Sequence, residues 1–152
     1  MASEMMFYDN FYDLQWGALN LKTATINVCL VKSTYTFDAT DTQLADVLGA
    51  ESVNEVANGS GYTSGGETLT AQAVTVETTP KRTKFTAANA TWTALTATFR
   101  YAVFYVSGTV ESLVNPPLCA VLLDTTPADI SIAGTDYTLM MSANGIFTSA
   151  IV

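Results

Sequence analysis

The sequence predicts an all-β domain, either an antiparallel β-sandwich or a jelly-roll-like fold, with a short helix at its N-terminus. The chain holds about eight short segments rich in β-branched and aromatic residues, and turn signals separate them at intervals of roughly ten residues. Threonine, which favours strands, occurs 24 times among 152 residues. Since 49% of the residues are apolar and neither a linker nor a repeat interrupts them, we expect residues 18–152 to form a single domain, preceded by residues 1–17 as an N-terminal arm.

The N-terminal segment carries apolar side chains at helical spacing. Phe7, Phe11 and Leu14 fall on one stripe, which predicts a short amphipathic helix over residues 3–17 that Gly17 would end. Such a helix either packs onto its own domain or docks, as an arm, on a neighbouring subunit. The aromatic residues expected at a subunit contact are Phe7, Tyr8, Phe11, Tyr12 and Trp16.

Strand, helix and loop signals follow in order. β-branched residues crowd residues 23–32 and predict a central strand, whereas residues 41–49 have the cap, spacing and final glycine of one or two helical turns. Residues 58–66 are glycine-rich and predict a mobile loop, after which residues 68–78 return to strand character. A hairpin tip is predicted over residues 80–84. This tip carries a basic cluster that consists of Lys81, Arg82 and Lys84. The cluster would either contact an acidic protein surface or be solvated.

The pattern of the second half of the chain predicts further strands. Residues 91–106 form the longest β-like stretch, and alternation from residue 98 onward predicts that both of its faces are mostly covered. Another strand is predicted over residues 118–123. Residues 137–142 and 146–151 flank the dipeptide Asn144-Gly145, which favours a type I′ turn and therefore predicts a β-hairpin.

The charge distribution excludes some classes of partner. The formal net charge is −8, and residues 1–77 account for all of it, with ten acidic residues against Lys22 and Lys32. Six Lys and Arg residues in the whole chain cannot supply the cationic surface that nucleic-acid binding needs, so we expect no nucleic-acid partner. No stretch reaches the roughly 18 apolar residues of a membrane span, and no leader peptide is recognisable, so we expect no membrane partner and synthesis in the cytoplasm.

The residue types argue against catalysis. The chain contains no histidine, which removes the commonest general base and the imidazole metal ligand. The aspartates show neither the pairing of a glycosidase nor the spacing of a calcium loop, and we interpret them as solvated turn residues. We therefore predict no enzymatic activity, no catalytic residue, no metal and no cofactor. The aspartates concerned are Asp38, Asp41, Asp46, Asp124, Asp129 and Asp136.

Three further residues have structural interpretations. Cys29 and Cys119 each lie in an apolar run, which is typical of buried free thiols; a disulfide between neighbouring strands is the alternative. Arg100 lies among aromatic residues, so we expect it to stack on a tyrosine or to pair with an acidic residue.

Four blocks of the sequence, taken in order, resemble one family of proteins. They are FYDNFYDLQWGALNLKTATINVCLVKSTYTFD at residues 7–38, GYTSGGETLT at 61–70, TWTALTATFRYAVFY at 91–105, and the ending from PLCAVLLD at 117–124 to ANGIFT at 143–148. This order of motifs is similar to that of small virion structural proteins of tailed bacteriophages, which include head-decoration, head-fibre and tail-associated proteins. Residues 125–129 replace a glycine-rich turn of that family, and Met140-Met141 replaces its Trp-Asn or Trp-Asp pair.

The resemblance implies a structural component of the virus particle, and the role we expect is that of a capsid decoration (cement) protein on the outer surface of a phage head. The expected partners are the major capsid protein and further copies of the chain, in a homotrimer, after synthesis in the host bacterial cytoplasm. Packaged DNA would repel a chain of charge −8, which also favours the outer surface. The arm would then hold the protein on the particle, and a chain without residues 1–16 would keep a folded β domain but lose that association.

Two alternatives stay open at this point. The first is a tail or head-fibre component. The second is a carbohydrate-binding module, in which exposed rings such as those of Trp16 and Trp92 would stack on sugars.

Overall fold

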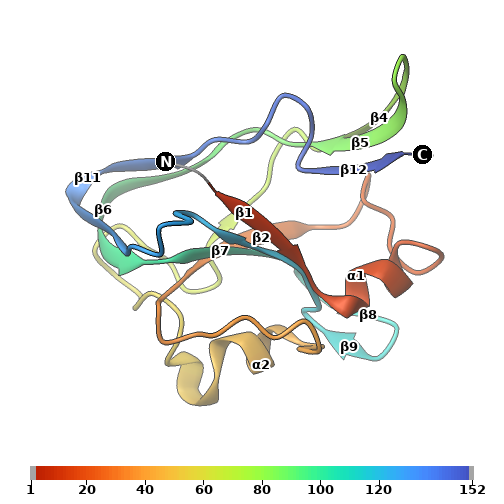
Figure 1. The fold of residues 1–152 in the computed structure, drawn as a ribbon. Helices are drawn as coiled ribbons and strands as arrows, with labels where there is room; N and C mark the ends of the chain where they lie inside the picture. The colour runs from red at the N-terminus through yellow and green to blue at the C-terminus, as the bar shows by residue number, and fades with distance from the viewer. Residues whose placement is uncertain (1–2, 151–152) are drawn as a thin grey trace.

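The computed structural model describes residues 3–150 and shows a mostly β, sandwich-like domain, which confirms the predicted fold class (Figure 1). Residues 1–2 of the predicted arm and 151–152 of the predicted domain lie outside this range. An antiparallel five-stranded sheet has the order β1-β10-β7-β2-β3, so that the strand predicted over residues 23–32 is flanked on both sides. Its strands are β1 (Glu4–Phe7), β2 (Ile26–Val31), β3 (Glu67–Thr68), β7 (Tyr101–Val106) and β10 (Pro117–Leu122).

Two smaller sheets lie on one side of this central sheet, and helix α2 lies on the other (Figure 1). One smaller sheet pairs β6 (Ala90–Phe99) with β11 (Ile130–Leu139), and another has the order β12-β5-β4. The latter consists of β4 (Ala73–Thr78), β5 (Lys81–Thr86) and β12 (Phe147–Ala150). The remaining elements are α1 (Asp9–Leu14), α2 (Leu44–Leu48), the 3₁₀ turn η1 (Ala50–Ser52), and the short pair β8 (Thr109–Val110) and β9 (Leu113–Val114). None of the helices within residues 3–150 is long and apolar enough to cross a bilayer.

Strand β7 divides its side chains between two hydrophobic cores, as the alternation predicted. Ala102, Phe104 and Val106 join the larger core between the central sheet and the smaller sheets. Val103 and Tyr105 join a second core on the opposite face. Because both faces are covered, the strand is apolar at nearly every position rather than at every second one.

The second core is closed by α2. Val47 of α2 is fully buried against the central sheet, beside Tyr35 from the loop that precedes the helix. The predicted helical turns are confirmed, but Gln43 rather than Asp41 caps them: the Gln43 N–H donates to the Asp46 carboxylate at 3.0 Å, and the Asp46 N–H donates to the Gln43 carbonyl at 3.0 Å. This reciprocal pairing satisfies N–H groups that a helix of five residues cannot satisfy internally.

The N-terminal segment differs from the helix predicted over residues 3–17. Its first part is strand β1, which pairs with β10 at the edge of the central sheet, and only Asp9–Leu14 is helical. The apolar strand β10 needs a hydrogen-bonding neighbour on that side, and pairing with β1 satisfies its peptide groups. Tyr8 and Phe11 are buried in the two cores. Residues 4–14 are therefore packed into the domain, so we now expect a chain without residues 1–16 to lose stability, in contrast to the expectation from the sequence.

Two predicted strand regions are interrupted. The stretch over residues 91–106 divides at Arg100 into β6 and β7, which belong to different sheets. The stretch over residues 68–78 divides into β3 and β4 around Ala71, whose φ is +50°. In β6 the register shifts near Ala94, and the Asp136 carboxylate accepts the Ala94 N–H at 2.9 Å. Because of these breaks, each of the two β-rich stretches contributes one strand to the central sheet and one strand to a smaller sheet.

The hairpin predicted around Asn144-Gly145 is wrong. A turn does occur there, closed by the Gly145 N–H donating to the Ser142 carbonyl at 3.0 Å. However, β11 before the turn pairs with β6, whereas β12 after it pairs with β5. Only Gly145 of the dipeptide has a positive φ, at +104°, and a type I′ turn needs positive φ at both central residues.

The glycine-rich segment over residues 58–66 is packed against strands, although its composition predicts a mobile loop. Gly66 has a φ of +73° and lies so close to β2 that a Cβ atom there would overlap the Val28 carbonyl. Gly134, in β11, has a similar φ of +67° but open space around it. Replacing Gly134 by alanine would therefore cost only the free energy of an unfavourable backbone conformation, whereas replacing Gly66 would also cost the free energy of a steric clash.

We expect Gly66→Ala to destabilise the domain more than Gly134→Ala. Both variants place a Cβ in the left-handed region, at about 1–2 kcal/mol each, but only Gly66→Ala must also push β2 away. Urea unfolding of the two variants beside the wild type measures the difference, and equal losses would show that the loop does not pack on Val28.

Candidate functional site

An apolar groove of about 280 Å³ lies between the α1 region and the sheet of β12, β5 and β4. On the helical side it is lined by Phe11, Gln15 and Trp16, and on the sheet side by residues that include Val74, Phe85 and Phe147. Strand alternation explains the sheet side: Val74, Phe85 and Phe147 lie directly opposite one another in the register of the three strands and so share a face.

The floor of the groove is a cluster of phenylalanine rings. Phe7 stacks on Phe11 with ring centroids 5.3 Å apart, and Phe11 lies 5.0 Å from Phe147. Phe147 in turn stacks on Phe85 at 5.4 Å. Such pairs add about 0.5–1.5 kcal/mol each beyond the area they bury, so the floor is a rigid part of the core.

Two large apolar side chains on this side of the molecule are exposed. Trp16, which follows α1 and lines the groove, is 87% exposed, and Val76 on β4 is 74% exposed. Val76 and Val74 share a face of β4 because they are two residues apart. Val76, Phe85 and Phe147 were not predicted as site residues; the signal for Val76 was the Val74–Val76 alternation within residues 73–78, whereas Phe85 is the one apolar residue of residues 81–86.

The aromatic residues predicted for a subunit contact differ in how far their side chains are exposed to solvent. Tyr8 is fully buried on the far side of the central sheet, where its hydroxyl bonds that of Tyr35 at 2.9 Å, so it cannot reach a partner. Phe7 and Phe11 support the groove from below. Tyr12, 55% exposed, and Trp16 are the two that present rings to solvent, and their interface role stays a prediction.

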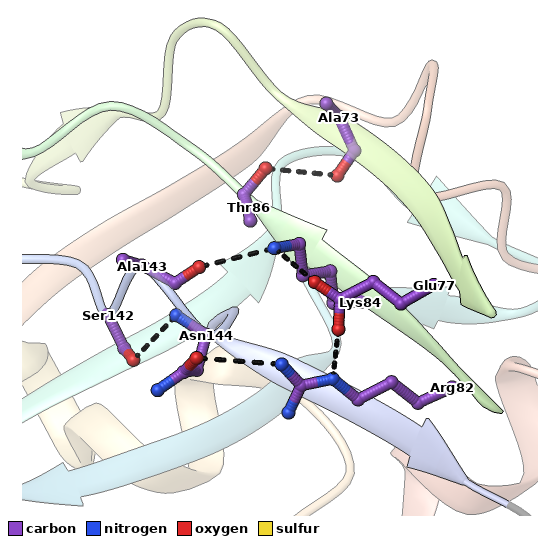
Figure 2. Close-up of polar contacts among 8 residues, drawn as sticks. All are labelled: Ala73, Glu77, Arg82, Lys84, Thr86, Ser142, Ala143 and Asn144. Atoms are coloured by element: carbon purple, nitrogen blue, oxygen red, sulfur yellow. Dashed lines mark hydrogen bonds and ion pairs between the residues drawn. The ribbon is translucent and has the colours of Figure 1, made fainter. Parts of the chain in front are cut away.

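The basic cluster lies on strand β5 rather than at a hairpin tip, because the turn is confined to Thr79-Pro80. Figure 2 shows Arg82 and Lys84 converging on Glu77 of β4, with the Lys84 Nζ 2.8 Å from a Glu77 oxygen. The Lys84 ammonium also donates to the Ala143 carbonyl at 3.3 Å. The hydrogen bonds from Arg82 and Lys84 lower the pKa of the Glu77 carboxyl. Two of the three predicted interface cations are thus held by a carboxylate.

A buried carboxylate holds the glycine-rich loop. Glu55 is 5% exposed, and its Oε1 accepts hydrogen bonds from the Tyr62 hydroxyl at 2.8 Å and the Gly65 N–H at 2.6 Å. The Tyr62 hydroxyl oxygen accepts the Leu30 N–H at 3.1 Å, and the Tyr105 hydroxyl donates to the Gly65 carbonyl at 2.8 Å. Burial raises the pKa of Tyr62, so its hydroxyl stays protonated and able to donate. This network ties the loop to β2 and β7.

Three of the aspartates that the sequence marks as turn residues have structural bonds. The Asp38 and Asp124 carboxylates accept hydrogen bonds from Thr40 and Thr126, which lower the pKa of both aspartates. Asp129 pairs with Arg100 at 2.8 Å, which confirms the structural role expected of that arginine. Residues 3–150 contain no group of three or more Cys, Asp or Glu side chains placed to hold a metal ion.

The two cysteines are free and buried, as interpreted. Cys29 belongs to the second core and Cys119 to the larger core, so the central sheet separates them. Burial raises the pKa of both thiols, which therefore stay protonated.

Comparisons of the chain with protein-family models, with curated proteins and with solved structures give no match.

We expect Tyr62→Phe to lower the free energy of unfolding by about 1–3 kcal/mol, because it removes one of the two hydrogen bonds to the buried Glu55 carboxylate and leaves the Leu30 N–H without the hydroxyl that accepts it. Tyr12→Phe, at an exposed ring, is the matched control and should change little. Chemical denaturation compares them, and a Tyr62→Phe variant as stable as Tyr12→Phe would contradict the role of the network.

We expect the contribution of Glu77 to stability to depend on pH. The folded-state pKa lies below the ordinary value of 4.5, so ionised Glu77 stabilises the fold above pH 4.5 and loses this effect as pH falls through the folded-state pKa. The melting temperature of wild type should exceed that of Glu77→Gln at neutral pH, and the two should converge at acidic pH, below the folded-state pKa of Glu77. Glu4→Gln, at an exposed position without an ion pair among the described residues, is the control; a constant gap for Glu77→Gln would contradict the ion pairs.

Proposed function

We propose that this chain is a virion structural protein of a tailed bacteriophage, a capsid decoration (cement) protein that binds the major capsid protein on the outer surface of the head. The single observation that carries the proposal is the exposed Trp16 beside an apolar groove. Surface aromatics of this kind are enriched at the centres of protein interfaces.

The energetics of such a contact are sufficient. Burying a tryptophan removes roughly 150–250 Å² from water, which corresponds to about 4–6 kcal/mol before the costs of association. The rigid phenylalanine floor below Trp16 adds preorganised apolar surface. Repetition of a modest contact over many capsid subunits then yields avidity without a large single interface.

Charge and sequence support the outer surface as the location. A chain with a net charge of −8 is repelled by packaged DNA, and the same charge keeps the free protein soluble before it docks. The four sequence blocks that resemble virion structural proteins include both the segment that carries Trp16 and the segment that carries Phe147. The helical side of the groove and Phe147 therefore come from those blocks, whereas Val74 and Phe85 on the sheet side lie outside them.

We expect Trp16→Ala to weaken binding to undecorated heads of the parent phage by at least about thirtyfold, the ratio that 2 kcal/mol represents. The exposure of Trp16 means that its removal should leave the fold intact. Met140→Ala, at another exposed apolar residue, is the control. Co-sedimentation with heads measures binding; full binding by Trp16→Ala would exclude the groove, and failure of the wild type to bind would exclude the decoration role.

A tail or head-fibre component is the runner-up, and the number of copies per virion distinguishes it. Hundreds of copies would support a shell protein, whereas a handful would support the tail or fibre. Quantitative mass spectrometry of purified virions provides the count.

Carbohydrate binding is the second candidate function, and Trp16 is also the observation that favours it. The exposed ring lies in a groove with the side chains of Gln15, Thr83 and Ser149, which can hydrogen-bond a sugar. Trp92 does not contribute, because it is 1% exposed and stacks on Tyr137 in the core. Saturable binding of wild type to a glycan array, lost in Trp16→Ala, would support this function in place of head binding.

A further inference from the structure

Strand β4 leaves one row of its peptide groups without a partner. The Thr86 hydroxyl donates to the Ala73 carbonyl, which shows that Ala73 faces β5 (Figure 2). The Phe85 carbonyl accepts the Ile146 N–H, which shows that Phe85, opposite Val74, faces β12 instead. Because peptide groups alternate along an antiparallel strand, those of Val74, Val76 and Thr78 point away from β5. Within residues 3–150 no other strand pairs with β4.

This edge lacks the features that usually prevent strands from pairing with other chains. β4 contains six residues without a proline, a lysine or a bulge, and it forms the outer strand of a hairpin that projects from the body of the domain (Figure 1). The long strand β11, in contrast, is interrupted by two register shifts. Water can satisfy the outward peptide groups of β4 in the free chain, and a protein partner that replaces this water along the whole row must itself be an extended β-strand.

We propose that β4 pairs with β4 of a second copy of this chain, antiparallel, about a twofold axis at Val76. The sheet of β12, β5 and β4 would then continue across the axis into its counterpart. Self-pairing of β4 goes beyond binding to a phage head and does not depend on it.

The side chains of β4 complement themselves in this register. Val76 meets Val76 of the second copy, so that two side chains that are each 74% exposed in the monomer cover one another. Val74 lies opposite Thr78, and Thr75 lies opposite Glu77, which can accept its hydroxyl hydrogen. The three outward-facing residues Val74, Val76 and Thr78 all fall opposite outward-facing residues, as hydrogen-bonded pairing requires.

The ion pairs of Glu77 remove local repulsion at the proposed axis. Arg82 and Lys84 compensate the Glu77 carboxylate within each chain, so the axis does not bring two uncompensated anions together. The antiparallel arrangement also directs the two hairpin turns, each followed by Lys81, to opposite ends of the contact. A parallel arrangement would place the two Lys81 side chains side by side.

A cysteine at the axis tests the register in the full-length protein. Residues opposite one another in a hydrogen-bonded antiparallel pair have Cα atoms about 5.5 Å apart, within the range that a disulfide spans. Val76→Cys should therefore form a covalent dimer under mild oxidation. Thr78→Cys is the matched control, because its counterpart would lie about 14 Å away along the strand. The native cysteines are buried and should not react. Equal cross-linking of both variants, or none of Val76→Cys, would overturn the proposal.

The mass in solution provides the second measurement. Sedimentation equilibrium over a series of concentrations should give a dimer for wild type, and Val76→Lys should raise its dissociation constant at least about tenfold by placing two cations on the axis. Val53→Lys, at a valine that is also exposed and lies outside the hairpin, should dimerise like wild type. A monomeric wild type, or a trimer that Val76→Lys leaves unchanged, would overturn the twofold pairing. Head binding by Val76→Lys is measured separately, so loss of one property is distinguishable from loss of the other.

Discussion

The burial of β7 on both faces is the constraint on which the rest of the molecule depends. A strand with apolar side chains on both faces must be covered twice, and a chain of 152 residues achieves this with two unequal layers. The smaller sheets cover one face and bury Phe104, while α2 and the loop before it cover the other and bury Val103. The N-terminal segment then completes the edge of the central sheet next to β10. Most other elements pack against one face of β7 or extend the sheet that contains it.

Local patterns predicted the elements that depend on local interactions. The alternation predicted from residue 98 onward is confirmed over residues 101–106, and the helical turns predicted within residues 41–49 are confirmed as α2, although Gln43 rather than Asp41 caps them. The dipeptide Asn144-Gly145 shows where this reasoning fails: it does form a turn, but whether the flanking segments pair with one another depends on which distant strands compete for them. Here β6 and β5 offer ten-residue and six-residue partners in two different sheets.

The candidate site could be predicted only in part for the same reason. Trp16 was identified because its ring is conspicuous in a short segment, yet the groove beside it depends on Phe147, which lies more than a hundred residues away along the chain. The helical spacing of Phe7 and Phe11 was real, but it came from a strand followed by a short helix that together place both rings against Phe147. Contacts of this kind are set by tertiary packing and leave no periodic signal in the sequence.

The separation of Cys29 from Cys119 by the central sheet has a consequence for where the fold can persist. Because the two thiols lie in different cores and neither is exposed, no intramolecular bridge can form without unfolding. The free energy of unfolding of this fold therefore includes no contribution from a disulfide between Cys29 and Cys119. Such a protein can assemble in a reducing cell interior and afterwards endure an aerobic exterior without any change in its covalent structure.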